Sequence, residues 1–394
     1  MRRPSRPEDS DDPQPGTLGR DRIFGAIAAA LFSVALGVAS VAVPLLAVRS
    51  GHGLTQVGIL IAISAVSQMA ARLFMGAMMR RIPDKAFVVG SALLIAVSCG
   101  LLTVSTSLLV FVVSQLLQGV ARAFFWTGSQ THAVRSSASA VGALTLINLA
   151  SGAGALVGPA LAGFLASRSL EFSLAVGAGI GAAAVVPSLL LVRFRPFLPV
   201  NQGDGAAPQQ IWRRPGVNAA CWMGVTAGSW RGLLNSYVPV MLSQAGQTAS
   251  AVGFLVAVAN GAALLGSAGS GWVRSWGARG SLLLGVITTG VGIAGIGAFA
   301  GTAYLAACCL AVSGVGAGIL QTVGPALATE TVHPEERGQA IASTGTFRAA
   351  ALFLAPMGMA GIVLFLPVGA ALLLAGFLMT TPALAGRSAA QAPG

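Results

Sequence analysis

Charged side chains are scarce in this chain, and acidic ones are the scarcest. The 394 residues include 23 Lys or Arg and 11 Asp or Glu, so 9% of the residues are charged and 55% are hydrophobic. Soluble domains contain about 25% charged residues. The composition, with a mean hydropathy of +0.80, therefore excludes a water-soluble fold.

Cysteine and lysine are also rare. The four cysteines lie in apolar runs and lack the paired spacing of a disulfide framework or a metal site, so we expect no metal and no cofactor. Arginine supplies 22 of the 23 basic residues, and this skew, with many Ala and Gly, is typical of a bacterial genome of high GC content. The basic residues are scattered between apolar segments, which argues against nucleic-acid binding despite the net charge of +12.

Long apolar runs are abundant. A helix needs about 20 apolar residues to cross the roughly 30 Å hydrocarbon core of a bilayer, and the chain contains twelve such segments, the last two divided by a tight turn near Gly358–Gly361. The predicted spans are 23–48, 57–79, 86–104, 108–131, 140–166, 173–192, 217–243, 249–273, 280–299, 303–329, 339–358 and 362–380.

The distribution of basic residues predicts the orientation. Cytoplasmic loops of membrane proteins are enriched in Lys and Arg. With the N-terminus inside, the cytoplasmic segments hold 17 basic residues and the external loops hold only Arg49 and Arg168. We therefore predict a multi-pass protein of the bacterial plasma (inner) membrane with both termini in the cytoplasm, monomeric, and with the lipid bilayer as its surroundings.

The chain also repeats itself. Val43-Pro44-Leu45 recurs as Val238-Pro239-Val240, 195 residues later. We predict an all-α integral membrane protein with two pseudo-symmetric six-helix bundles, in which a substrate would bind between the halves. The expected parts are a disordered tail at 1–22, bundles at 23–192 and 217–380, a cytoplasmic linker with a short interfacial helix at 193–216, and a second tail at 381–394.

A motif in the fifth span carries a family resemblance. It reads Gly154-x-x-x-Gly158-Pro159-x-x-Ala162-Gly163, in which small residues let another helix approach closely and the proline kinks the helix. The motif resembles the antiporter motif of the major facilitator superfamily, typical of its 12-helix drug:proton exporters. The resemblance implies a secondary transporter that works by alternating access, exports a small compound and exchanges it for protons.

Two further segments are similar to the same superfamily, with substitutions. In the fourth span, Gln118-Gly119 is similar to its fourth-helix motif, with Gln115 in place of the usual arginine and Arg122 one turn beyond. The loop after the second span is similar to the superfamily's conserved loop, with Arg80 at its acidic position. We assign gating or interface roles to Arg72, Arg348, Gly154, Gly158, Pro159, Gly163, Gly76, Arg80, Arg81 and Asp84.

Polar side chains inside the spans follow a pattern. Four arginines and seven amides occur there, and the third, sixth, ninth and twelfth spans contain none, which places these four helices at the periphery. Each arginine costs roughly 2.5–3.5 kcal/mol to insert. The alternatives are a bond to backbone carbonyls near the cytoplasmic surface, left open for Arg72 and Arg348, or a cavity role, which we favour for Arg122 and Arg231. The predicted cavity residues are Arg122, Arg231, Asn235, Gln118, Gln115, Trp126, Trp230, Tyr237 and Ser40.

No Asp or Glu falls inside a predicted span. A cation exporter usually needs a buried acid to pair with its substrate and to carry the proton. We therefore expect a small anionic or amphipathic organic substrate, held by Arg122 and Arg231 through charge-assisted hydrogen bonds. If protons are exchanged, the candidate carriers are Glu330, Asp84 and His132.

Three other functions were weighed against export. An uptake permease for an organic anion and a non-transporting membrane sensor on the same fold both remain open. A membrane enzyme is disfavoured, because the chain lacks Asp-rich metal motifs and the intramembrane Ser/His or paired Asp residues of membrane proteases. No catalytic residue is predicted.

Overall fold

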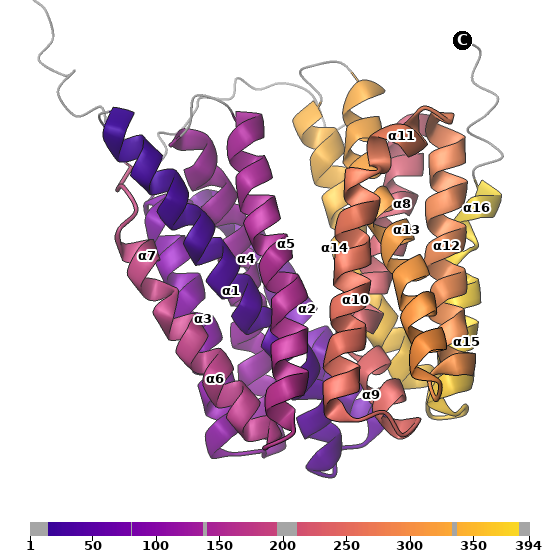
Figure 1. Ribbon diagram of the computed structural model, residues 1–394. Helices are drawn as coiled ribbons and strands as arrows, with labels where there is room; N and C mark the ends of the chain where they lie inside the picture. Colours follow the sequence, from indigo (N-terminus) through magenta and orange to yellow (C-terminus); the bar gives the residue numbers. More distant parts are fainter. Residues whose placement is uncertain (1–14, 80, 137–139, 195–210, 333–336, 386–394) are drawn as a thin grey trace, which may run out of the picture.

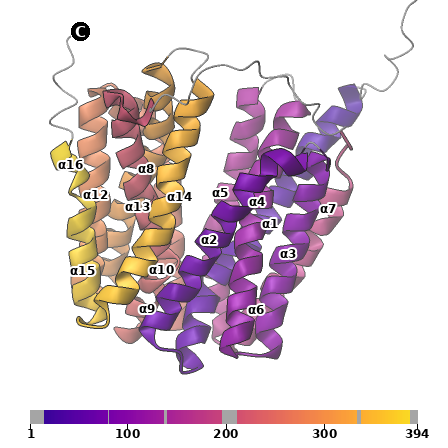
Figure 2. The ribbon, with the colours of Figure 1, turned by 180° about the vertical axis from the view of Figure 1, so that it is seen from behind.

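The computed structural model describes residues 15–79, 81–136, 140–194, 211–332 and 337–385, and the regular secondary structure of these residues is entirely helical. Figure 1 shows two bundles of helices side by side, and Figure 2 shows the same pair from behind. We call residues 15–194 the N-bundle and residues 211–385 the C-bundle. The predicted all-α membrane fold is confirmed.

The helices are continuous because a segment in lipid must satisfy its backbone hydrogen bonds internally. Within the described residues, the N-bundle contains α1 (Pro15–Arg49), α2 (Leu54–Met79), α3 (Asp84–Val104), α4 (Leu108–Arg135), α5 (Ala140–Ala166), α6 (Leu170–Ala183) and α7 (Val185–Leu189). The C-bundle contains the 3-10 helix η1 (Ile211–Arg213), then α8 (Pro215–Leu234), α9 (Tyr237–Gln244), α10 (Ala249–Ala268), α11 (Ser270–Arg274), α12 (Gly277–Phe299), α13 (Ala303–Glu330), α14 (Arg337–Ile362), α15 (Val368–Met379) and α16 (Pro382–Ala385).

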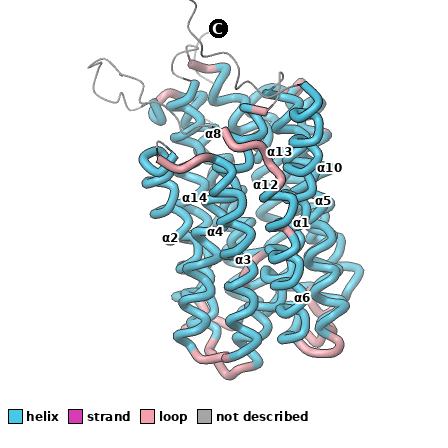
Figure 3. Tube along the Cα trace, turned by 90° about the vertical axis from the view of Figure 1, so that its left-hand side faces the viewer, coloured by secondary structure: helices cyan, strands magenta, loops and turns pink. Residues whose placement is uncertain are grey.

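Both ends of the helical chain lie on one side of the molecule. The start of α1 and the helix α16 are at the top of Figure 1, and we call this side the tail end and the opposite side the far end. Figure 3 shows the helices from a third direction, joined by loops at both ends. Consecutive spans therefore run in opposite directions.

Ten helical segments of the described residues are long and apolar enough to cross a bilayer. Two of the twelve predicted spans fall outside that set. The twelfth, α15, is an apolar helix of 12 residues. The seventh is divided into α8 and α9 at Asn235–Ser236, because Pro239 has no N–H to donate to the carbonyl of Asn235.

The predicted disordered tail at 1–22 extends too far. Helix α1 already begins at Pro15, and proline is favoured at the start of a helix because its missing N–H would have no partner there. Asp21, placed in the tail by the sequence argument, lies inside this helix and is 1% exposed. Residues 1–14 lie outside the described part of the chain.

The turn before the last span also lies later than predicted. Helix α14 continues through Gly358 and Gly361 to Ile362, and α15 starts after Pro367. A residue that precedes proline disfavours the helical conformation. The turn is therefore set by Pro367 and not by the two glycines.

Of the predicted linker at 193–216, residues 195–210 lie outside the described part. The segment that follows them contains η1, a single 3-10 turn where an interfacial helix was expected. Ile211 is buried against Val217 and Ala220 of α8, and the ring centroid of Trp212 lies 6.0 Å from that of Phe347. The chain therefore enters the C-bundle anchored to α8 and α14.

The bundles meet through four main helices. Helix α2 packs against α14 and α5 against α10, with α1 against α9 beside them. Among the described residues, none of the substantial contacts between bundles involves α3, α6, α12 or α15, which agrees with their predicted peripheral position.

Three hydrogen bonds join the bundles near the far end, where the ribbons also lie closest together in Figure 1. Tyr237 Oη donates to the carbonyl of Leu54 at 2.9 Å, and Thr55 Oγ1 donates to the carbonyl of Ala360 at 3.2 Å. The third runs from Ser250 Oγ to the carbonyl of Gly163, at 3.0 Å. We call these contacts the far-end lock.

Candidate substrate-binding site

Four arginines from both bundles converge between them. Arg72 lies on α2 and Arg122 on α4, while Arg231 lies on α8 and Arg348 on α14. They come together because α2 packs against both α4 and α14, and α14 packs against α8. We call these four residues the arginine cluster.

The arginines lie at increasing depth from the tail end. Arg72 is in the last third of α2, which ends there at Met79, and Arg348 is in the first half of α14, which starts there. Arg122 is at the middle of α4, and Arg231 is in the last turn of α8, which also starts at the tail end. Because each helical residue advances about 1.5 Å, the four form a line of positive charge from the tail end towards the middle of the molecule.

Three of these guanidinium groups bind neutral partners. Arg231 Nη1 donates to Asn260 Oδ1 at 2.6 Å, and Arg348 Nη2 donates to Gln321 Oε1 at 2.9 Å. Arg122 Nη1 has a long contact of 3.5 Å with Ser64 Oγ. Amide and hydroxyl oxygens orient a guanidinium group, but they do not neutralise its positive charge.

The arginines carry like charges, and the described residues supply no counterion for them. Arg231 is close enough to Arg348 and Arg122 to feel their charges, and Arg348 is close enough to feel that of Arg72. Among the described residues, the carboxylates that form ion pairs are bound to His132, Arg135 and Arg274. Within the part of the chain that the structure describes, the arginine cluster is therefore a positively charged site without a neutralising acid.

Buried amides lie beside Arg122. Gln115 is 1% exposed, and neither its Nε2 nor its Oε1 has a hydrogen-bond partner among the described residues. The same is true of Gln118 Nε2, Gln68 Oε1 and Arg122 Nε. Each unsatisfied buried group costs about 1–3 kcal/mol, so this part of the α2–α4 contact carries unused hydrogen-bonding capacity.

The close approach of α2 and α4 explains this crowding. Gly119 lies directly against the Ser67 hydroxyl and the Ser64 carbonyl, so that an added Cβ would overlap both. The small residue therefore lets the polar face of α4 lie against α2.

The break between α8 and α9 lies one turn beyond Arg231. Asn235 ends α8, and Ser236 Oγ donates back to the carbonyl of Gly232 at 2.7 Å. Discontinuous helices at the middle of a membrane protein expose helix ends that bind ions and polar groups. At this break, the carbonyls of Arg231, Gly232 and Leu233 are already hydrogen-bonded, to the Asn235 N–H, the Ser236 hydroxyl and the Ser236 N–H respectively.

The other predicted cavity residues have different surroundings. Trp230 is fully buried: its ring centroid lies 4.8 Å from the guanidinium carbon of Arg231, and its Nε1 donates to Ser313 Oγ at 3.1 Å. Tyr237 is fully buried in the far-end lock. Ser40 Oγ donates to the carbonyl of Gly37 at 2.7 Å within α1. Trp126 packs edge to face on Phe125, with ring centroids 5.2 Å apart.

The residues predicted to gate or to pack helices divide between two contacts. Gly154 and Gly158 lie against α1, within the N-bundle, where Gly37 meets both Gly158 and Pro159. Gly163 meets Gly253 of α10 across the bundle interface, next to the far-end lock. Arg72 and Arg81 are exposed. Arg80 and the surroundings of Gly76 lie outside the described residues.

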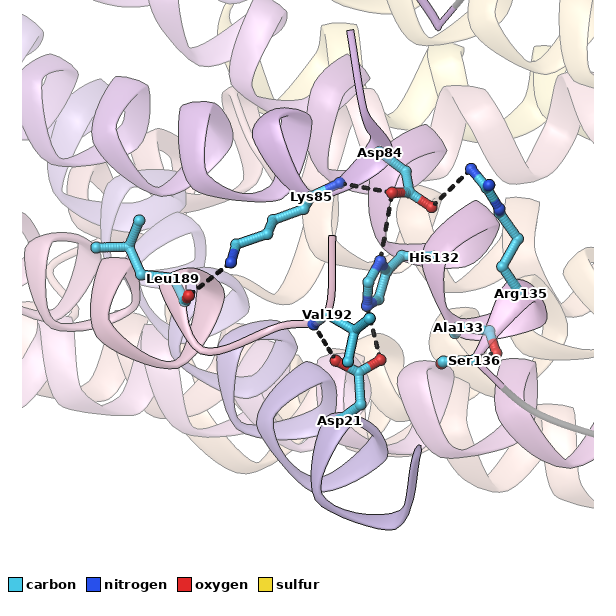
Figure 4. A network of polar contacts seen from close by, with 9 residues as sticks. All are labelled: Asp21, Asp84, Lys85, His132, Ala133, Arg135, Ser136, Leu189 and Val192. Atoms are coloured by element: carbon cyan, nitrogen blue, oxygen red, sulfur yellow. Dashed lines mark hydrogen bonds and ion pairs between the residues drawn. The ribbon is translucent and has the colours of Figure 1, made fainter. Parts of the chain in front are cut away.

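A second charged group lies at the tail end of the N-bundle (Figure 4). His132 Nε2 lies 2.8 Å from Asp21 Oδ2, and His132 Nδ1 lies 3.5 Å from Asp84 Oδ1. Arg135 Nη1 lies 3.5 Å from Asp84 Oδ2. The N–H of Val192 donates to Asp21 Oδ1 at 2.6 Å. We call Asp21, Asp84, His132 and Arg135 the tail-end network.

The sequence argument missed this network because it placed Asp21 in a tail. It named Asp84 as a gating residue and named Asp84 and His132 as candidate proton carriers, without pairing them. The available signal was the absence of a helix breaker between Asp21 and the apolar run that follows it. That continuity would have extended the first helix over Asp21.

Two helical bundles with polar side chains gathered between them define a membrane transporter with two halves. Residues 25–356 match the Major Facilitator Superfamily, and the chain belongs to this superfamily. The resemblance drawn from the fifth span is thereby confirmed at the level of the superfamily. No curated protein sequence matches the chain.

Solved structures of transporters share the fold. A mutant of the nucleoside transporter NupG matches with a TM-score of 0.77 and 12% identity, over 95% of this chain and 99% of that one. A POT family transporter in complex with a thioalcohol-conjugated peptide matches with a TM-score of 0.75 and 12% identity, over 93% of this chain and 95% of that one. At this identity the likeness concerns the fold alone.

Proposed function

We propose that this secondary transporter moves a small organic anion, or an amphipathic compound with an anionic group, and that the arginine cluster binds it. The observation that carries the proposal is the set of guanidinium groups from both bundles that lack an acidic partner among the described residues. A carboxylate or phosphate bound there would touch both halves of the protein at once.

The energetics favour an anionic ligand. An arginine in the bilayer costs roughly 2.5–3.5 kcal/mol, and a hydrogen bond to a charged group contributes about 1.5–3 kcal/mol. The planar guanidinium matches the two oxygens of a carboxylate or phosphate. Arg122 and Arg231 are the binding residues in this proposal, with Arg348 nearer the tail end, and Gln115 and Gln118 supply hydrogen bonds to uncharged parts of the ligand.

The proposed setting is the plasma membrane of a bacterium, with the tail end in the cytoplasm. The 17 basic residues assigned to that side support this orientation. With the far-end lock formed, the site would then be reached from the cytoplasm. The fifth-span motif supports export as the direction, and uptake of an organic anion is the alternative.

A binding screen with matched compounds tests the substrate class. Purified protein in nanodiscs is heated with succinate, benzoate, uridine monophosphate or inorganic phosphate, and with the uncharged succinamide, benzamide and uridine. At least one anion should raise the unfolding temperature, while its uncharged counterpart should not. The cationic compound benzylamine is included as well. Stabilisation by benzylamine, without stabilisation by any of the anions, would overturn the proposal.

Variants separate the site from a general effect of charge. Arg231→Gln should abolish the shift that the anion causes, because the deepest guanidinium is removed. The matched control is Arg213→Gln, since Arg213 is exposed in η1 and packs on Trp212. Equal loss in both variants would assign the effect to overall charge and not to the site.

Direction and proton exchange are tested in everted membrane vesicles. Export predicts that vesicles with the tail end outside accumulate the labelled anion, whereas uptake predicts accumulation in right-side-out vesicles. Proton exchange predicts that an imposed pH gradient drives the movement and that the movement dissipates it. Accumulation that ignores the gradient would exclude proton exchange.

A further inference from the structure

The arginine cluster also constrains how transport is coupled, an inference that rests on the proposed function. We propose that the protein is an obligatory anion exchanger: the bundles change their relative position around the arginine cluster only when an anion neutralises it. Every organic anion that leaves is then replaced by a carboxylate or phosphate that enters through the same site.

The first reason is that the described acids are already engaged elsewhere. Asp21 and Asp84 bind His132 and Arg135, and Glu330 binds Arg274. Glu171 lies in the first turn of α6, at the far end. None of these carboxylates is positioned to take the place of a departed ligand beside the cluster.

The second reason is the position of the arginines on the helices that must approach one another. Opening the far-end lock and closing the tail end would bring α2 and α14 together along their tail halves. Arg72 and Arg348 lie on those halves, on two helices that pack against each other, and carry like charges. Closure removes water from between like charges, which strengthens their repulsion and leaves a buried charge without compensation.

A bound anion removes that obstacle. Its negative charge offsets the repulsion between Arg122, Arg231 and Arg348, and its oxygens accept the hydrogen bonds that water provided in the open state. The loaded carrier can then close, while the empty one stays open to one side. This difference between loaded and empty states makes transport an exchange.

Proton exchange would need a group that titrates at the interface. The partners of the cluster arginines are Asn260, Gln321 and Ser64, and none of these side chains titrates. The tail-end network contains a histidine and two aspartates, but it joins α1, α3 and α4 inside the N-bundle. Its protonation would not neutralise the arginine cluster.

The experiment measures uptake into proteoliposomes with different contents. Labelled succinate, benzoate, uridine monophosphate and phosphate are each presented outside. The vesicles contain either an unlabelled mixture of the four anions or dextran sulfate, which is too large to enter the site. Valinomycin and equal potassium on both sides, with nigericin, remove voltage and pH gradients from every sample.

Exchange predicts that at least one labelled anion enters at least about tenfold faster when the four-anion mixture is inside. Equal uptake into both kinds of vesicle would overturn the exchange and leave the proposed function standing. Uptake of none of the labelled anions under either condition would overturn both. Mixtures with phosphate alone or succinate alone inside identify which anion serves as the counter-substrate.

A built-in counterion provides the sharper test. Asn260→Asp places a carboxylate where Asn260 Oδ1 now accepts from Arg231, and Gln321→Glu does the same for Arg348. The ratio compares the uptake rate with the four anions inside to the uptake rate with dextran sulfate inside. Either variant should reduce this ratio to about threefold or less, because the empty carrier can now close. Both uptake rates are measured at anion concentrations that saturate each variant, because a loss of affinity would otherwise lower the ratio as well.

Asn218→Asp is the matched control. It adds the same charge to α8, at a part-exposed position where Asn218 Nδ2 donates to the carbonyl of Trp212, away from the cluster. This variant should keep the full dependence on internal anions. An unchanged ratio in both Asn260→Asp and Gln321→Glu, with normal binding in the thermal screen, would overturn the mechanism.

Discussion

The tail-end network and the arginine cluster are both groups of charged side chains inside the helical bundles, and they differ in whether those charges are paired. In the tail-end network, each ring nitrogen of His132 faces an aspartate, and Asp84 also faces Arg135 (Figure 4). In the arginine cluster, the guanidinium groups face amides, a hydroxyl and one another. The tail-end network pairs its charges within the protein, whereas the arginine cluster has no acidic partner among the described residues.

The difference follows from where each group lies. The tail-end network joins helices of one bundle, so its partners can stay in contact throughout a transport cycle. The arginine cluster extends across two bundles that must separate on alternate sides. Permanent ion pairs there would hold the bundles together, whereas a mobile anion can leave. The contrast separates charge that fixes a structure from charge that binds a ligand.

We expect the largest change in stability from a substitution in the tail-end network. Asp21→Ala removes the partner of His132 Nε2 and of the Val192 N–H, and breaking a buried ion pair on one side costs about 3–5 kcal/mol. We expect a marked fall in the unfolding temperature measured in detergent by intrinsic fluorescence. An unfolding temperature indistinguishable from that of the unmodified protein would contradict the structural role of this network.

In the arginine cluster, removal of a charged side chain should not lower the unfolding temperature. Arg231→Leu removes a charge that costs roughly 2.5–3.5 kcal/mol in the bilayer and loses one hydrogen bond to Asn260, worth about 1.5–3 kcal/mol. Stability without ligand should therefore be unchanged or slightly higher. The dissociation constant for the anion found in the screen should rise about 10- to 150-fold, measured by titration calorimetry.

Arg274→Leu is a suitable control for the second prediction. Arg274 is partly exposed and pairs with Glu330 outside the cluster, so its loss should leave the dissociation constant unchanged. A loss of stability in Arg231→Leu as large as that in Asp21→Ala would remove the contrast between the two regions. It would mean that the arginine serves the fold.

Sequence predicted the bundles well because the signals for them are additive. A run of apolar residues long enough to cross the bilayer makes a span wherever it occurs, and the excess of basic residues on one side does not depend on any single position. Part of the arginine cluster could be predicted from the sequence for the same reason, because an arginine inside an apolar run is easily recognised. Arg122 and Arg231 were singled out on that ground, and Arg348 was left open between two roles.

Sequence failed where the outcome depends on which helices meet. Trp230 directly precedes Arg231 in the chain and Tyr237 follows it by six residues. Both side chains were therefore predicted to line the cavity. The break at Asn235–Ser236 places Tyr237 in the far-end lock. Trp230 binds Ser313 through Nε1, but its ring does lie against Arg231, with the centroid 4.8 Å from the guanidinium carbon. Asp21 was missed because its partner, His132, lies 111 residues away, a separation that one sequence does not reveal.

The far-end lock gives a smaller and more specific effect. Tyr237→Phe removes the hydrogen bond to the Leu54 carbonyl, which is worth about 0.5–1.5 kcal/mol. The proportion of molecules open at the far end should therefore rise about two- to twelvefold. Double electron–electron resonance between spin labels at the far ends of α2 and α14 would measure the change in distance distribution.

The control for the lock lies in the same break. Ser236→Ala removes a hydrogen bond of similar strength to the Gly232 carbonyl, but within the C-bundle. It should leave the distance distribution unchanged while lowering stability slightly. If both variants shift the distribution equally, flexibility of the α8–α9 break and not the inter-bundle contact holds the far end closed.

The smallest expected effect concerns an ion pair that resembles the tail-end network in chemistry but not in burial. Glu330 pairs with Arg274 at the tail end of the C-bundle, where the two side chains are 52% and 38% exposed. Exposed pairs contribute about 0–1 kcal/mol because water screens them. Glu330→Gln should therefore lower the unfolding temperature far less than Asp21→Ala. Raising the salt concentration should erase even this difference, whereas the effect of Asp21→Ala should persist. An effect of Glu330→Gln equal to that of Asp21→Ala would show that burial does not set the strength of these pairs.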